Sequence, residues 1–127
     1  AIDAWDGRST GSDATVKYPE AADFEAVKRT FSPYQNVHLL RGIIPAVLSE
    51  LPAAKIAFAF FCLGDTEAEI AALETLLPRL DQGGIFILNG FGRRRTSDAQ
   101  RRRMIQIADK NAIEPLVMPT GHALLLR

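Results

Sequence analysis

Two apolar runs of the chain each end in a short turn whose residues could do chemistry. The first run, Ile56–Leu63, contains Cys62 and stops at Gly64-Asp65-Thr66, and the second, Ile85–Leu88, stops at Asn89-Gly90. A doubly wound sheet holds its ligand at the carboxyl ends of its strands. These turns therefore form the candidate site, and they offer a thiol, a carboxylate and an amide.

The N-terminal part predicts short strands and helices in alternation. A strand with its exit turn opens the chain at Ile2–Gly7. A later helix is predicted by residues spaced i, i+3 and i+7, and Ser32-Pro33 should end it; its apolar face consists of Phe24, Val27 and Phe31. Val37–Leu40 predicts a short strand ending at Arg41-Gly42. Pro45 suits the first turn of a second helix, which should run up to Pro52.

The C-terminal part places a helix after each apolar run. Thr66-x-x-Glu69 and Ser97-x-x-Gln100 have capping-box spacing, in which each side chain satisfies a backbone N–H of the other residue. The apolar positions predicted to be buried are Ile70, Leu73, Leu76, Leu77 and Leu80 in the first helical segment, and Met104, Ile107 and Ala108 in the second. Two segments separated by a Pro-Thr-Gly-His turn, Leu116–Met118 and Ala123–Leu126, predict a terminal antiparallel hairpin.

Composition predicts a single domain over residues 1–127 of a cytoplasmic protein. The chain is 47% hydrophobic, which suffices for one core. A single cysteine excludes a disulfide framework and a zinc site built from several cysteines. The apolar runs are too short to span a membrane. Because the chain opens inside an apparent strand without an initiator Met, we expect it to be a fragment of a longer protein or a processed product.

Charge is distributed unevenly along the chain. Residues 1–90 carry 7 basic and 12 acidic side chains, and residues 91–127 carry 8 and 3. Two triplets, Arg93–Arg95 and Arg101–Arg103, account for most of the basic excess. They could grip phosphates of RNA or an acidic partner, but no aromatic residue is interleaved to stack on bases. A solvated or interdomain surface is therefore favoured, and nucleic-acid binding is disfavoured.

An ordered set of motifs resembles class I S-adenosylmethionine-dependent methyltransferases, and is most similar to the macrocin O-methyltransferase family. The set comprises Ile2-Asp3-Ala4-Trp5-Asp6-Gly7, Val37–Gly42, Ala72-Leu73 through Leu77-Pro78-Arg79-Leu80, Gly83-Gly84 and Pro119-Thr120-Gly121-His122-Ala123-Leu124. The resemblance implies an α/β, Rossmann-like fold with a mainly parallel sheet and a C-terminal antiparallel hairpin, lacking the family's first strand. It implies S-adenosylmethionine as cofactor and a small hydroxylated acceptor.

The sequence departs from the family at the metal site. The family carries Asp-x-Asp after its fourth strand and Asp-Asp after its fifth, and these hold a divalent cation. The matching positions here are Cys62, Gly64, Asn89 and Gly90, none of which is a carboxylate. Hard cations prefer several carboxylate ligands, and the displaced Asp65 with the Asn89 carbonyl would make a poor site. The sequence therefore predicts no metal and leaves the catalytic residues unknown.

The second departure is the absence of the family's glycine-rich cofactor loop. Of the remaining cofactor positions, the resemblance implies that Asp3 accepts hydrogen bonds from the ribose and that Trp5 and Gly42 lie near the nucleoside. A solvated carboxylate and a turn glycine are equally good explanations of Asp3 and Gly42. The family's strand order, 3-2-1-4-5-7-6, would lack its central strand. A preceding segment, a strand from another chain or from a homo-oligomer, or a changed strand order would each resolve this.

Three other reactive side chains have structural explanations. A nucleophilic role for Cys62 would need a nearby cation or helix N-terminus to favour the thiolate, and a small buried packing residue is favoured instead. His38 is expected to be structural within its strand, and His122 to lie in the hairpin turn with its polar tip in solvent.

The resemblance and its departures leave two functions open. The chain could be an S-adenosylmethionine-dependent O-methyltransferase acting on a sugar or natural product, or a non-catalytic methyltransferase-like module for association or regulation.

Overall fold

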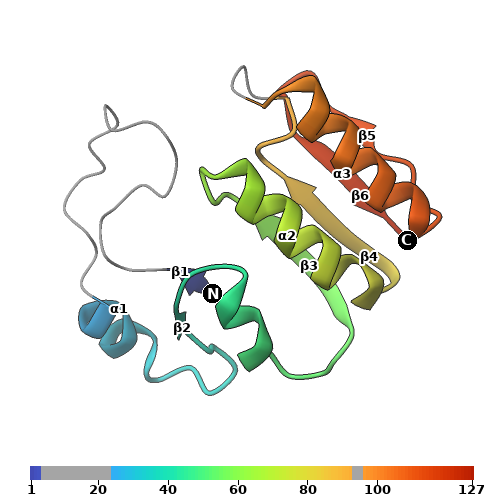
Figure 1. The fold of residues 1–127 in the computed structure, drawn as a ribbon. Helices are drawn as coiled ribbons and strands as arrows, with labels where there is room; N and C mark the ends of the chain where they lie inside the picture. The colour runs from blue at the N-terminus through green and yellow to red at the C-terminus, as the bar shows by residue number, and fades with distance from the viewer. Residues whose placement is uncertain (4–23, 93–95) are drawn as a thin grey trace. The chain divides into compact units, whose positions relative to one another are not determined.

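Residues 1–3, 24–92 and 96–127 are described by the structure, a computed structural model. They fall into two units, Ala1–Leu51 and Pro52–Arg127, and each is described by itself (Figure 1). Trp5 and Arg93–Arg95 lie outside the described residues. The expectation of a single domain stays a prediction.

The first unit contains one parallel strand pair and two short helices. β1 (Ile2–Asp3) pairs with β2 (Leu40–Arg41) in the register Ile2↔Leu40 and Asp3↔Arg41. α1 (Phe24–Phe31) ends where Ser32-Pro33 predicts, and the segment after Pro45 is a 3₁₀ helix, η1 (Ala46–Glu50).

The strand predicted at Val37–Leu40 is shifted toward its C-terminal end. Among the described residues, the ladder pairs Leu40 and Arg41 with Ile2 and Asp3. His38 therefore lies outside the strand, which corrects the prediction. Its side chain is exposed, and its backbone carbonyl accepts a hydrogen bond from the Ala1 ammonium group at 2.8 Å.

The second unit is a four-stranded sheet with two α-helices. Its elements are β3 (Ile56–Phe61), α2 (Thr66–Leu76), η2 (Leu77–Arg79), β4 (Leu80–Leu88), α3 (Asp98–Lys110), β5 (Leu116–Val117) and β6 (Ala123–Leu126). The strand order is β3-β4-β6-β5. β3 and β4 are parallel, whereas β6 is antiparallel to both β4 and β5, so the predicted C-terminal hairpin is confirmed.

The core of this unit lies between one face of the sheet and the two helices, which run side by side over it (Figure 1). All eight apolar residues predicted to be buried in the two helical segments are buried. The strands contribute alternate residues to the same layer, as a pleated sheet requires; these are Phe61, Phe86, Leu88, Ala123 and Leu125. The inward faces of both helices are thus explained by helical periodicity.

The opposite face of the sheet is also apolar. Phe58 pairs with Ile85, which pairs with Leu126 on its other side, and a second row runs through Phe60, Ile87 and Leu124. Phe58 and Phe60 are 61% and 51% exposed. Within the described part of Pro52–Arg127 no helix covers this face, because both α-helices lie on the other one.

The described residues therefore form a mixed α/β structure with a four-stranded sheet and three α-helices. The described strands form two separate sheets, with the orders β1-β2 and β3-β4-β6-β5. None of the described helices has the length and apolar character needed to cross a membrane.

Candidate functional site

The carboxyl ends of β3 and β4 bring Cys62 and Asn89 together. Phe61 and Leu88 are register partners at the ends of these parallel strands, and the Asn89 N–H donates to the Phe61 carbonyl at 3.0 Å. The Asn89 side-chain amide donates to Cys62 Sγ at 2.8 Å. Two of the four positions that the resemblance aligns with the family's aspartates are therefore in direct contact.

Cys62 is exposed rather than buried, which corrects the packing interpretation. Its neighbour Phe61 points into the core, and successive side chains of a strand point to opposite faces. The apolar run that contains Cys62 therefore gives no indication of its burial.

These strand ends do not fit a hard divalent cation. Gly64 and Gly90 have no side chain, and the Asn89 side chain turns its amide nitrogen toward sulfur. Asp65 Oδ1 accepts hydrogen bonds from the backbone N–H groups of Glu67 at 2.9 Å and Ala68 at 3.4 Å. Among the described residues no three His, Cys, Asp or Glu side chains are grouped as metal ligands.

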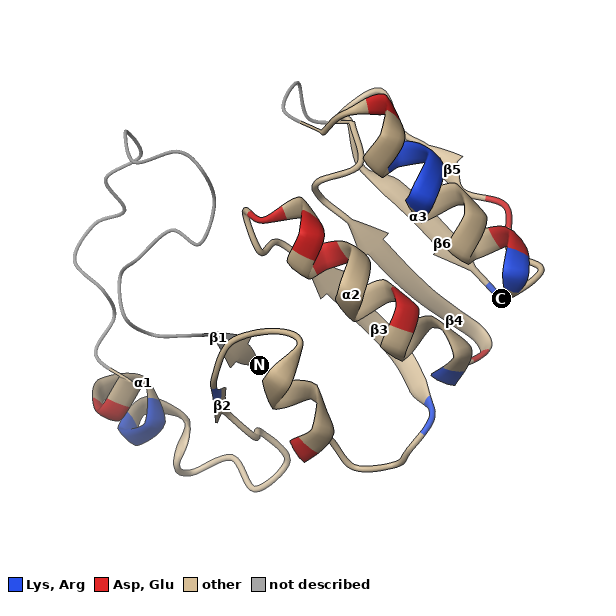
Figure 2. Cartoon of the chain, viewed as in Figure 1, with Lys and Arg blue, Asp and Glu red and all other residues tan. Residues whose placement is uncertain are grey.

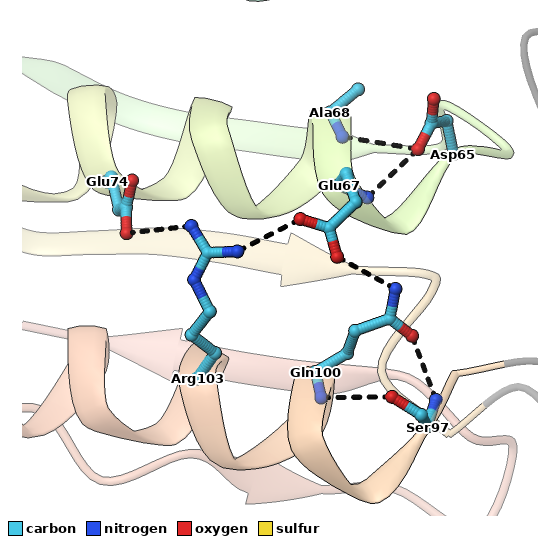
Figure 3. A network of polar contacts seen from close by, with 7 residues as sticks. All are labelled: Asp65, Glu67, Ala68, Glu74, Ser97, Gln100 and Arg103. Atoms are coloured by element: carbon cyan, nitrogen blue, oxygen red, sulfur yellow. Dashed lines mark hydrogen bonds and ion pairs between the residues drawn. The ribbon is translucent and has the colours of Figure 1, made fainter.

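Asp65, and not Thr66, caps α2 (Figure 3). The predicted Thr66-x-x-Glu69 box is therefore wrong, because the carboxylate one residue earlier takes the capping position and α2 begins at Thr66 itself. The second predicted box is confirmed: Ser97 and Gln100 exchange both hydrogen bonds at the start of α3, at 3.2 Å and 2.9 Å.

Glu69 is the site residue that the sequence interpretation missed. Its side chain is only 1% exposed. Oε1 accepts a hydrogen bond from the Leu63 N–H at 3.3 Å, and Oε2 accepts one from the Gly90 N–H at 3.1 Å. The available signal was its position on the inward stripe of α2 with Ala72, Leu73 and Leu76, where a charged residue is exceptional.

The loop after β4 is held by backbone contacts and one buried hydroxyl. Thr96 is 1% exposed, and its Oγ1 donates to the Gly90 carbonyl at 2.5 Å. The Gly92 N–H donates to the Gly121 carbonyl at 2.7 Å, which ties the loop to the β5–β6 turn. His122 lies in that turn as predicted, with Nδ1 2.8 Å from Thr120 Oγ1, although its side chain is half-buried.

In the first unit, Asp3 and Gly42 lie at the same end of the parallel strand pair. Asp3 ends β1 and pairs with Arg41, which directly precedes Gly42. A Cβ on Gly42 would lie 2.7 Å from Val47 Cβ, so close packing of η1 requires glycine there. This explains Gly42 by packing. The roles of Asp3, Trp5 and Gly42 in cofactor binding stay predictions.

The second arginine triplet is partly neutralised by neighbouring carboxylates. Arg103 bridges Glu67 at 2.9 Å and Glu74 at 3.4 Å, so it joins α3 to α2 (Figure 3). Arg101 pairs with Asp98 at 2.7 Å, and its hydrogen bond and charge hold the pKa of Asp98 below its ordinary value. Figure 2 shows acidic segments along α2 beside basic segments of α3. Arg103 therefore stabilises the contact between the helices, whereas the pair of Arg101 with Asp98 lies within α3.

Comparison with known proteins identifies a similar fold among solved structures. No protein-family model and no curated protein sequence matches the chain. Among solved structures it is similar to the O-methyltransferase NovP, with a TM-score of 0.67 and 17% identity. The two chains share a methyltransferase fold. The match covers 99% of this chain but 58% of NovP, so the chain spans little more than half the length of this structural neighbour.

Proposed function

We propose that the chain is the greater part of an S-adenosylmethionine-dependent O-methyltransferase-like domain. The observation that carries the proposal is the fold shared with NovP along 99% of the chain. The ordered motifs resembling the macrocin O-methyltransferase family support it. By that resemblance, the acceptor is a small hydroxylated molecule such as a sugar or natural product.

The proposed cofactor residues are Asp3, Trp5 and Gly42. A carboxylate at the end of a strand suits a ribose, because ionised acceptors make strong hydrogen bonds to hydroxyl groups. We propose that the glycine-rich loop that approaches the methionine part belongs to a further segment, of this or another polypeptide.

The proposed transfer proceeds without a metal. S-adenosylmethionine, when bound, would supply the methyl group, and the chain would have to hold it beside the acceptor hydroxyl and beside a base that takes up the hydroxyl proton. The strand ends offer Cys62 and Asn89 but no carboxylate at the four metal positions. Rate enhancement would therefore depend on holding the two reactants in line and on a base from elsewhere.

A second function is supported by the interactions of the strand ends. Glu69 uses both carboxylate oxygens to bind backbone N–H groups, and Asp65 caps a helix. Carboxylates used in this way stabilise the domain instead of meeting a substrate. This favours a non-catalytic methyltransferase-like module that acts by association or regulation.

Calorimetric titration of the chain with S-adenosylmethionine, with and without Mg²⁺, separates the two functions. The enzyme proposal predicts micromolar affinity that is unchanged by Mg²⁺, and such binding would contradict an inert module. Asp3→Asn should weaken binding about tenfold or more, because a hydrogen bond to a charged group contributes about 1.5–3 kcal/mol. Asp81→Asn, at an exposed position of β4, is the matched control. No heat at millimolar cofactor would contradict the enzyme proposal for this chain.

A further inference from the structure

Glu69 connects the ends of two neighbouring strands from a third element. It lies on α2, while its two hydrogen-bond donors follow β3 at Leu63 and β4 at Gly90. A buried carboxylate is costly unless it is hydrogen-bonded, and bonds between an ionised acceptor and backbone N–H groups are among the strong ones. This single side chain therefore holds together the ends of β3 and β4, where the candidate site lies.

The Glu69 carboxylate lies against Gly90, in the space that a side chain at position 90 would occupy. A Cβ built on Gly90 would lie 2.1 Å from Glu69 Oε2 and 2.9 Å from its Cδ. The backbone cannot readily yield, because the Gly90 N–H is held by Glu69 and its carbonyl by Thr96. An aspartate at position 90 is thus incompatible with Glu69 as it lies here.

We propose that Glu69 is a built-in substitute for the cation that members of the family resembled by the sequence motifs hold at the corresponding strand ends. In the family, a cation draws carboxylates of adjacent strand ends together. Here, one carboxylate from the helix draws two backbone N–H groups together, and the glycine at 90 makes room for it. Glu69 is therefore a positioning residue. Its carboxylate fills the space that a metal-binding side chain at position 90 would need.

The inference predicts coupling between positions 69 and 90, whether or not the domain transfers methyl groups. Gly90→Ala should lower the thermal midpoint when Glu69 is present, because the buried Glu69 carboxylate has to move away from the added Cβ. In a Glu69→Ala background the same substitution should shift the midpoint much less, because the clashing carboxylate is gone. Equal shifts in both backgrounds would overturn the proposal. Glu67→Ala, an exposed glutamate of the same helix, is the matched control background and should give no such relief.

Amide hydrogen exchange tests the fastening in a variant that conserves side-chain size. Glu69→Gln keeps the shape of the side chain but replaces one acceptor oxygen by an NH₂ donor. We expect exchange at the Leu63 or Gly90 amide, or at both, to become about tenfold faster or more, the effect of losing a bond worth about 1.4 kcal/mol. Glu67→Gln should leave both amides unchanged. Unchanged protection in Glu69→Gln would contradict the proposal.

A titration with Mn²⁺, read by water-proton relaxation, tests whether Glu69 replaces a bound cation or is itself a ligand of one. If Glu69 takes the place of the cation, the wild-type chain and Glu69→Gln should give the same weak response. Micromolar Mn²⁺ binding that is lost in Glu69→Gln would identify Glu69 as a metal ligand and overturn the inference. None of the three readouts depends on methyltransferase activity, so the inference can fail while the proposed function stands.

Discussion

The backbones of Gly92 and Gly121 pack directly against each other. The Gly92 N–H donates to the Gly121 carbonyl at 2.7 Å, and a Cβ on Gly92 would lie 2.6 Å from the Gly121 Cα. Gly121 itself has φ of +85°, a conformation that favours glycine. This contact joins the loop after β4 to the turn between β5 and β6.

Gly92→Ala should therefore destabilise the four-stranded unit by about 1–3 kcal/mol, the usual range for overpacking against a rigid neighbour. Urea unfolding followed by circular dichroism measures it. The matched control is Gly83→Asn: Gly83 has φ of +74°, a Cβ there would meet nothing within 4 Å, and asparagine tolerates such angles. The control should cost less than about 1 kcal/mol. A Gly92→Ala variant as stable as wild type would contradict this packing.

The two faces of the sheet should respond differently to loss of a phenylalanine. Phe86 is fully buried and packs edge-to-face on Phe61 with ring centroids 5.4 Å apart. Phe86→Ala should cost about 3–5 kcal/mol of unfolding free energy, because it leaves a cavity. Phe58→Ala, on the exposed face, should cost much less and should reduce binding of a hydrophobic dye. Similar losses for both variants would contradict the assignment of the faces.

Arg103 should contribute modestly to stability in a salt-dependent way. Its two carboxylate partners are about half exposed, and exposed ion pairs are worth about 0.2–1 kcal/mol each. Arg103→Ala should lower the free energy of unfolding by about 0.5–1 kcal/mol at low ionic strength, and by less in about 1 M salt. Arg102→Ala, an exposed arginine on the same helix, is the control and should show a smaller salt-dependent effect.

Asp98 should give stability a weak dependence on acid pH. Its hydrogen bond and ion pair with Arg101 lower its pKa in the folded state. Its contribution is therefore present above the ordinary Asp pKa of about 3.9 and is lost as the pH falls through the lower folded value. Wild type should be slightly more stable than Asp98→Asn at pH 7, and the difference should vanish in acid. In an Arg101→Gln background the substitution should make much less difference at any pH.

The regular elements of the second unit could be predicted because periodicity reports burial directly. The inward residues of α2 and α3 follow the helical repeat, and the terminal hairpin follows from its turn residues. The same logic fails for Cys62, because a strand inside an apolar run has apolar residues on both faces and hydropathy does not distinguish the covered one.

The role of Glu69 could not be predicted from spacing alone. Thr66-x-x-Glu69 satisfies the capping-box pattern, but Asp65 competes for the capping position and wins with its carboxylate. Glu69 lies on the inward stripe of α2 with Leu73 and Leu76, so its buried carboxylate needs hydrogen-bond partners, and it finds them at two strand ends. Those partners are backbone groups that follow β3 and β4, and a residue pattern does not reveal them.

The β3–α2–β4 arrangement also bears on how the chain acquires its structure. The two parallel strands are joined through one helix, and the last pair forms a hairpin, so most pairings in this sheet connect neighbours along the sequence. Such local closure favours rapid folding, since little loop entropy is lost before contacts form. During synthesis, β3, α2 and β4 could assemble before the hairpin leaves the ribosome. The later strands would then be added to a template that already exists.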